Sequence, residues 1–438
     1  MNMKKLLKSK RRGSALPLAV VAVIILLAMG VGLLSLGFNS RVYSIRTASD
    51  IAARCAADAG LTMALFEMNE KLQVKPFKEG TLPEAMAVKL PYSDQVCNYR
   101  VTGNLAGGYT IWSLGESDRA RRSVRATIGL KGAFDHAILT KQTLTLKSGT
   151  TIDGYNSKDP FDADIDIAIG SQSASDSSLV LNSGVIVNGD VFAGGNLDSA
   201  IKDLGAKITG EKYTGEQVDF PKVYAPTMDN KGAISATGET VKITSADSGT
   251  YTSIDLQQLI TKEKGVTTTT IGVLEIEGDV VLHVTGDIKL GNSCEIVVTK
   301  DSSLTIYSDG NINCNNGSGV NTQNPPEKAE TFQLYATGTE PQYFDIKAKS
   351  EFTGVIYAPD ADVDLYAKGD AYGSIIAHDF EFKAGGNFYY DEALKKKNDA
   401  DDEAVQFVVE RWYESPPFMS ASDIQPGILD AVPIQILK

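Results

Sequence analysis

The sequence contains few of the residues on which metalloenzymes and nucleophilic enzymes depend. Its 438 residues include only three histidines, four cysteines and two tryptophans. His136, His283 and His378 are isolated in strand-like surroundings, and there is no HExxH motif and no Cys–His cluster with the spacing of a zinc site. A phosphate-binding loop and a GxSxG motif are also missing. We therefore expect no metal, no cofactor and no enzymatic activity.

The four cysteines are too few for a disulfide-stapled scaffold. Cys55 and Cys97 fall in different expected elements, whereas Cys294 and Cys314 lie close together within one β-rich stretch. Because thiols can oxidise in an exported chain, Cys294 and Cys314 form a possible disulfide. The alternative is that both are free and buried, packing as small apolar side chains.

Charge of one sign is concentrated at the N-terminus. Residues 1–13 hold six Lys and Arg residues and no acidic residue, which leaves 36 basic against 55 acidic side chains in the remainder. Because basic flanks stay on the cytoplasmic side of a membrane, this split predicts a short cytoplasmic end attached to an acidic external body. An acidic body also argues against nucleic acid as a partner.

One acidic string could in principle bind calcium, since that ion prefers oxygen ligands. It consists of Asp159, Asp162, Asp164 and Asp166. The string lacks the loop glycine and the terminal bidentate glutamate of an EF-hand, so we expect a solvated loop there.

A long apolar segment follows the basic stretch. Residues 14–39 contain no charge, and residues 16–36 are apolar apart from Gly, Pro and Ser. A helix of this length is about 31 Å long and crosses a hydrocarbon core, whereas the apolar region of a secretory signal peptide is only about 7 to 15 residues long. Apolar residues continue at helical spacing to Leu72, which predicts one transmembrane and amphipathic helix over residues 14–72.

The junction between leader and helix reads Arg11-Arg12-Gly13-Ser14. With the basic leader at 1–13 and the apolar helix, it resembles a type IV prepilin, closest to the PilX-type pilus assembly proteins. The resemblance implies that a prepilin peptidase cuts between Gly13 and Ser14. Major pilins begin with a methylated Phe and carry Glu at the fifth mature position, where this chain has Ser14 and Leu18, which implies a minor or tip subunit. The alternative is a single-pass anchor whose leader is never cut.

Residues 73–132 alternate in the manner of strands. Three runs, near residues 96–101, 109–114 and 124–130, are separated by Gly107-Gly108 and by a polar stretch. They predict a small antiparallel sheet that packs on the helix, which is also the arrangement of the pilin-like family that the chain resembles. Four arginines nearby are expected to form a solvated hairpin edge: Arg119, Arg121, Arg122 and Arg125.

Residues 133–390 consist of short runs rich in Val, Ile, Thr and Tyr, separated by Gly, Asn, Asp and Ser. A five-residue pattern recurs at 187–191, 276–280 and 284–288, with a variant at 307–312. It consists of an apolar residue, any residue, Gly, then Asp or Asn, and a second apolar residue. Repeated strand–corner units predict a parallel β-helix, or solenoid, with a β-sandwich as the alternative. Helical spacing at residues 254–260 predicts one short helix within this domain.

The runs at 352–359, 372–377 and 388–391 resemble an uncharacterised extracellular β-solenoid domain found behind PilX-type N-termini. The resemblance implies an architecture and no ligand. Residues 391–438 are polar and punctuated by prolines, and are expected to form a tail or cap with one short helix over residues 403–412.

The chain is therefore expected to be mainly β with a long N-terminal helix, held by a single pass in the cytoplasmic (inner) membrane with its body in the periplasm or outside the cell. The expected role is that of a minor pilin-like subunit of a type IV pilus or type II secretion-like assembly, used for adhesion or capping. The expected partners are the membrane, other pilin or pseudopilin subunits, prepilin peptidase and a surface polysaccharide. The alternatives are a membrane-anchored carbohydrate-active enzyme of β-helix fold and a stand-alone surface adhesin.

Overall fold

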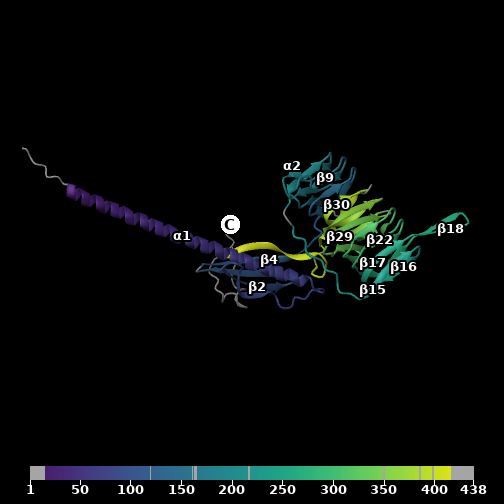
Figure 1. The fold of residues 1–438 in the computed structure, drawn as a ribbon, viewed down its shortest axis with the longest axis horizontal. Helices are drawn as coiled ribbons and strands as arrows, with labels where there is room; N and C mark the ends of the chain where they lie inside the picture. The colour runs from purple at the N-terminus through teal and green to yellow at the C-terminus, as the bar shows by residue number, and fades with distance from the viewer. Residues whose placement is uncertain are drawn as a thin grey trace, which may run out of the picture. The chain divides into compact units, whose positions relative to one another are not determined.

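The structure is a computed structural model that describes residues 15–118, 120–159, 161, 165–215, 218–348, 351–383, 386–396 and 399–415. The chain divides into two compact units. The helix–sheet unit comprises Met1–Glu70, Glu79–Gly129 and Val408–Lys438. The stack unit comprises Lys71–Lys78 and Leu130–Phe407. Figure 1 shows the long helix of the first unit and the layered strands of the second.

A single helix, α1, spans Ala15–Leu72 and is 58 residues long, which confirms the predicted long N-terminal helix. Among the described residues it is the one helix long and apolar enough to cross a membrane, and its most apolar window has a mean hydropathy of 2.8. The first half is bare, with Leu16 78% and Leu34 75% exposed. Full burial starts at Ala53. The first half of α1 therefore presents an apolar surface that its own chain does not cover.

A sheet of five strands completes the helix–sheet unit, in the order β1-β2-β3-β4-β32, with antiparallel pairing from β1 to β4. Its strands are β1 (Glu84–Lys89), β2 (Val96–Asn104), β3 (Gly108–Ser117), β4 (Ala120–Gly132) and β32 (Val405–Ser415). The antiparallel registers of β2 with β3 and of β3 with β4 confirm the predicted meander. The prediction of a helix over residues 403–412 is wrong. The segment is rich in β-branched and aromatic residues, which favour the strand that pairs with β4.

The second half of α1 packs on this sheet through small side chains. Four of its alanines are fully buried: Ala53, Ala56, Ala57 and Ala64. The hydroxyl of Tyr99 on β2 donates a hydrogen bond of 2.5 Å to Glu67 of α1, and burial together with this carboxylate raises the pKa of Tyr99 to about 12. Helix and sheet are thus joined by close backbone packing and by a polar contact.

The arginines of the β3–β4 hairpin do not lie on the expected edge strand, because β4 lies between β3 and β32, although Arg121 is 52% exposed. Arg122 binds Asp50 of α1 with two hydrogen bonds, of 2.7 Å and 2.5 Å. Arg121 forms an ion pair of 3.2 Å with Glu116 on the neighbouring strand. Arg119 lies outside the described residues. The bidentate pair of Arg122 adds an orientation-specific link between helix and sheet.

Two segments build the stack unit. The first contains β5 (Ile138–Thr140), β6 (Leu144–Leu146), β7 (Thr151–Tyr155), β8 (Ala168–Ser171), β9 (Leu179–Leu181), β10 (Ile186–Val187), β11 (Asp190–Ala193), the helix α2 (Leu197–Ala200), β12 (Ile201–Asp203), β13 (Lys207–Ile208) and β14 (Lys212–Thr214). The second opens with β15 (Asn230–Thr237), β16 (Thr240–Thr244), the 3-10 turn η1 (Ser245–Asp247), β17 (Gly249–Gln257), β18 (Leu259–Glu263), β19 (Val266–Thr270), β20 (Val273–Glu277), β21 (Asp279–Val284), β22 (Ile288–Leu290) and β23 (Glu295–Val298). It continues with β24 (Ser303–Ser308), β25 (Ile312–Cys314), β26 (Gly319–Thr322), η2 (Pro326–Thr331), β27 (Phe332–Ala336), β28 (Gln342–Ala348), β29 (Phe352–Ala367), β30 (Ala371–Phe382), β31 (Phe388–Asp391) and η3 (Glu392–Lys396).

Parallel pairing dominates this unit. Of its strands, 21 form one sheet, and β16, β20, β23 and β26 form a second sheet of four. Every pairing between described strands of these two sheets is parallel, whereas the sheets of the sandwich considered as the alternative are antiparallel. The expectation of a mainly β chain with a long N-terminal helix is confirmed.

The order of strands in the stack differs from their order in the chain. From β17 the pairing runs through β21, β24, β27 and β29 to β30. β30 then pairs with β5, which opens the first segment, and the pairing continues through β8 and β11 to β14. The chain thus enters at the middle, runs to one end, crosses to the other end and returns to the middle. Figure 1 shows β9, β30, β22 and β15 following one another along the stack.

One column of aliphatic side chains follows this order. Its members are paired in register on successive strands: Leu282, Ile306, Leu334, Ile356, Ile375, Ile138, Ile169 and Val191. None is more than 2% exposed. Because the column passes from Ile375 to Ile138, the two segments share one apolar core.

The predicted Gly-Asp and Gly-Asn corners lie between strands and bond to one another. The side chain of Asp287 accepts the N–H of Asn311 (3.1 Å), whose own side chain accepts the N–H of Tyr343 (2.8 Å). The side chain of Asn387 accepts the N–H of Thr151 (3.2 Å) and so joins the last corner of the second segment to the first segment. Each such side chain satisfies a backbone donor that the parallel ladder leaves free at the bend.

The prediction of a short helix over residues 254–260 is wrong. Ile254 and Leu256 belong to β17 and are fully buried, while Leu259 and Ile260 belong to β18 and are exposed. β18 pairs with β19 in an antiparallel hairpin, and Figure 1 shows this hairpin projecting from the stack. The apolar spacing that suggested a helix comes from two strands with different surroundings.

Acid is expected to destabilise the stack unit through His136. Burial lowers the pKa of His136 from 6.5 to about 4, and its ring lies 5.1 Å from that of Phe192. Between these two pKa values the unfolded chain binds a proton that the folded chain does not, so stability falls as the pH falls, by roughly 3 kcal/mol in all. Urea unfolding of the wild type and of His136→Asn, measured from pH 7 to pH 4, checks this. Equal pH dependence in both proteins would contradict it.

Candidate functional site

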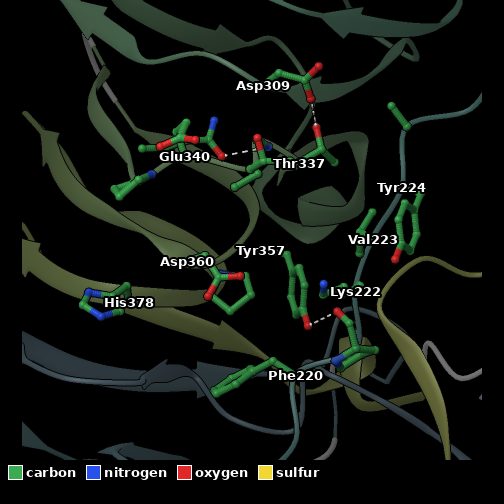
Figure 2. A pocket seen from close by; sticks show the side chains of 18 of the residues that line it. Phe220, Lys222, Val223, Tyr224, Asp309, Thr337, Glu340, Tyr357, Asp360 and His378 are labelled. Atoms are coloured by element: carbon green, nitrogen blue, oxygen red, sulfur yellow. Dashed lines mark hydrogen bonds between the residues drawn. The ribbon is translucent and has the colours of Figure 1, made fainter. Parts of the chain in front are cut away.

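An open groove of 810 Å³ runs along the stack unit. It lies between the connection at residues 220–225 and the turn at residues 336–342, and parts of β29 and β30 also line it. Two of the three histidines of the chain, His283 and His378, are among its lining residues. In Figure 2, Asp309 and Thr337 lie at one end of the groove and His378 at the other, with Asp360 and Tyr357 between them.

Side chains of the stack hold the connection that forms one wall. The hydroxyl of Tyr357 donates a hydrogen bond of 2.6 Å to the carbonyl of Pro221, and burial raises the pKa of Tyr357, which keeps this donor protonated. Gln172 donates to the carbonyl of Val218 at 2.8 Å. Lys141 lies 5.2 Å from the ring centre of Phe220. The wall is therefore fixed by contacts from several parts of the stack.

The first histidine of the groove belongs to a polar chain of three residues. His283 of β21 lies 2.8 Å from Asp309, which directly follows β24, the parallel neighbour of β21. The second carboxylate oxygen of Asp309 accepts a hydrogen bond of 2.7 Å from the hydroxyl of Thr337. Both oxygens of this carboxylate therefore have partners within the protein.

The second histidine meets two carboxylates. His378 Nδ1 lies 3.0 Å from Asp362 and 3.0 Å from Asp379. Asp362 of β29 and Asp379 of β30 are register partners on adjacent parallel strands. The other oxygen of Asp379 accepts the N–H of Thr143 at 2.7 Å, which fixes the direction of this carboxylate.

The groove is acidic. Its lining includes one lysine, Lys222, and four carboxylates: Asp309, Glu340, Asp360 and Asp362. Lys141 pairs with Asp360 at 2.6 Å. Such a lining suits a cation or a ligand that donates hydrogen bonds, such as a sugar hydroxyl, and disfavours an anion.

Of the residues predicted as sites, those that the structure describes do not line this groove. Gly13 and Ser14, the predicted cleavage positions, lie outside the described residues. Cys294 and Cys314 are buried in the core of the stack, and burial raises the pKa of Cys314 to about 11. Their pairing stays a prediction. Of the acidic string, Asp166 is exposed and pairs with Lys395 at 2.8 Å, whereas residues 162 and 164 lie outside the described residues.

Sequence reasoning missed the groove and both of its histidine–aspartate groups. His283 and Asp309 are 26 residues apart, and His378 and Asp362 are 16 apart. These spacings match no metal or catalytic motif, and they become neighbours only through the register of parallel strands. The one local signal was the alternating run Asp360-Ala361-Asp362 followed by the pair His378-Asp379.

Residues 227–397 match the model of a domain of unknown function (DUF7305). Among solved structures, the chain is similar to the competence-associated pilin ComZ from Thermus thermophilus, with 14% identity and a TM-score of 0.28, over 84% of this chain and 98% of that chain. No curated protein matches the sequence.

Proposed function

We propose that this chain is a membrane-anchored, pilin-like subunit that presents the stack unit outside the membrane and does no catalysis. The observation that carries the proposal is the division of α1 into two halves. Its first half is apolar and bare, while its second half is buried under the antiparallel sheet of the same unit. A bare apolar helix of this length needs lipid or other helices around it.

Assembly through α1 is a consistent mechanism. Gly30, Gly32 and Gly37 have nothing within 4 Å of the position of a Cβ, so neighbouring helices could approach closely there. Leu18 stands where major pilins carry the Glu that neutralises a neighbouring N-terminus. We therefore propose a minor or tip subunit of a type IV pilus or type II secretion-like assembly, with other pilin or pseudopilin subunits and prepilin peptidase as partners.

We further interpret the stack unit as a β-solenoid of the kind that the sequence suggested behind a PilX-type N-terminus. The parallel ladders, the aliphatic column and the side-chain bonds between successive corners support this interpretation. Coils that share one core form an elongated body suited to adhesion or capping, with a surface polysaccharide as the proposed contact.

A carbohydrate-active enzyme remains the competing function, because carboxylates gather in the groove. Asp309 is held by His283 and Thr337, and Asp360 is held by Lys141. A glycosidase needs one carboxylate as an acid and a second as a base or nucleophile. Asp362 is held in turn by His378. Since three of the four groove carboxylates already have protein partners, we favour binding over catalysis.

Cleavage between Gly13 and Ser14 tests the pilin-like role. We expect protein purified from membranes of the native host to begin at Ser14, as read by N-terminal sequencing and intact mass. Gly13→Val should keep residues 1–13 and stay in the membrane fraction, because α1 is unchanged. Ser14→Ala is the matched control and should be cut normally.

Two results would count against the proposal. Wild-type protein that keeps Met1 would indicate a plain anchor and favour the stand-alone adhesin. A start beyond residue 36 would indicate a removed signal sequence and no anchor at all.

A further inference from the structure

Asp362 and His378 of the groove lining lie beside Asp379, and the three side chains point their ligand atoms at one another. Asp362, His378 and Asp379 each offer one atom, and these atoms all lie within 4.8 Å of one another. We propose that they bind one divalent transition-metal ion of the Zn²⁺ type, with its remaining coordination positions open to the groove. This inference is independent of the pilin-like role, since it concerns the stack unit alone.

The bend of two adjacent strands brings these residues together. Consecutive residues of a regular strand point to opposite faces, so His378 and Asp379 would normally diverge. Here the register of β29 with β30 jumps from Ala358–Ala377 to Asp362–Asp379, which places a corner at His378. The corner turns both side chains toward Asp362 on the neighbouring strand. The backbone geometry therefore brings the three residues into one cluster.

Two of the three distances between the ligand atoms are close to those around a coordinated ion. Metal–ligand bonds of about 2.0 to 2.1 Å in a tetrahedron put the ligand atoms about 3.3 Å apart. The two distances from His378 Nδ1 to the carboxylates are 3.0 Å, so each needs to widen by only a few tenths of an ångström. The hydrogen bond from Thr143 N–H to Asp379 acts as a support from outside the ligand set, and such contacts orient ligands in metal sites.

The donor set selects the class of ion. Calcium and magnesium prefer ligand sets made of oxygen, whereas one imidazole with two carboxylates suits Zn²⁺ or Mn²⁺. Three protein ligands leave at least one position for water or for a ligand atom. The side chains of Asp362, His378 and Asp379 are 56%, 39% and 37% exposed, so that position is reachable from the groove.

The same contacts have a simpler explanation, which the experiment must separate from metal binding. Ionised carboxylates only accept hydrogen bonds, so Nδ1 of His378 donates its hydrogen to them in the protein without metal. The His283–Asp309 pair has this arrangement with one carboxylate and provides a natural control. A metal site requires that both carboxylates and the imidazole contribute to the affinity for the ion.

Metal titration of the full chain in detergent micelles tests the inference. We expect one equivalent of Zn²⁺ to bind in calorimetry, and one equivalent of Co²⁺ to give a visible absorption band that Zn²⁺ abolishes. Loss of a ligand should weaken Zn²⁺ binding at least about tenfold in each of His378→Ala, Asp362→Asn and Asp379→Asn. His283→Ala, which alters the other groove histidine, should stay within twofold of the wild type.

Far-ultraviolet circular dichroism and the melting temperature of each variant establish that it is folded. Asp362→Asn keeps the shape of an exposed side chain, so it remains informative if His378→Ala fails to fold. Absence of saturable binding in the wild type would overturn the inference. So would folded ligand variants that bind Zn²⁺ as tightly as the wild type, or a His283→Ala variant that loses binding equally.

Discussion

Replacing Gly373 with alanine is expected to destabilise the stack unit by more than about 4 kcal/mol, or to prevent its folding. Gly373 of β30 is the register partner of Gly354 on β29 and has a φ of +132°, which L residues rarely adopt. A Cβ at Gly373 would lie 1.9 Å from the carbonyl oxygen of Gly354. Strain and clash therefore act together near the centre of the stack. Guanidinium unfolding of the full chain measures the effect.

Gly149→Ala is the matched control for this substitution. Gly149 also has a positive φ, of +79°, but a Cβ there would have nothing within 4 Å. Because only the conformational strain acts there, Gly149→Ala should lower the free energy of unfolding by about 1 to 2 kcal/mol. If both variants lost the same stability, the close approach of β29 and β30 would not be the cause, and the register described for these strands would be in doubt.

Replacing Gly115 with valine is expected to separate the sheet of the helix–sheet unit from α1. A Cβ at Gly115 would lie 2.0 Å from the carbonyl oxygen of Ala53 and 2.4 Å from the backbone nitrogen of Ala57. Both atoms belong to the helix backbone, so no side-chain rotation can make room. We expect a loss of more than about 3 kcal/mol and faster amide hydrogen exchange in β3.

Gly107→Ala in the same meander is the comparison for Gly115→Val. Near Gly107 the only contacts of a Cβ would be side-chain atoms of Asn104, the closest at 3.1 Å. This exposed turn should tolerate alanine with a change of less than about 1 kcal/mol. A Gly115→Val protein with wild-type exchange in β3 would show that the strand does not lie on the helix backbone.

The long helix and the meander could be predicted because their causes are local. An uncharged apolar run and the spacing of apolar residues up to Leu72 define α1, and period-two alternation between glycines defines β2, β3 and β4. The prediction failed where one pattern had two explanations. Residues 254–260 and 403–412 have apolar spacings compatible with a helix, but partner strands were available for both.

The corners could be predicted, but their stacking order could not. Gly-Asp and Gly-Asn pairs mark bends in any β fold, whereas the pairing of Ile375 with Ile138 depends on where a distant segment docks. The groove follows from that order, since its walls come from the connection at 220–225 and from β29 and β30. The cluster at His378 depends on the shift in register between β29 and β30, and this shift gives no periodic pattern in the sequence.

The route of the chain through the stack also determines the order in which its strands can pair during synthesis. β5, β6 and β7 leave the ribosome well before β30 and β31, with which they pair. Until those last strands arrive, the early ones keep an open edge with unpaired backbone groups, the kind of edge that attracts other chains. Closure needs contacts more than 200 residues apart, which slows folding. A chaperone that shields open β edges during folding would therefore matter more for this protein than for one whose strands stack in the order of synthesis.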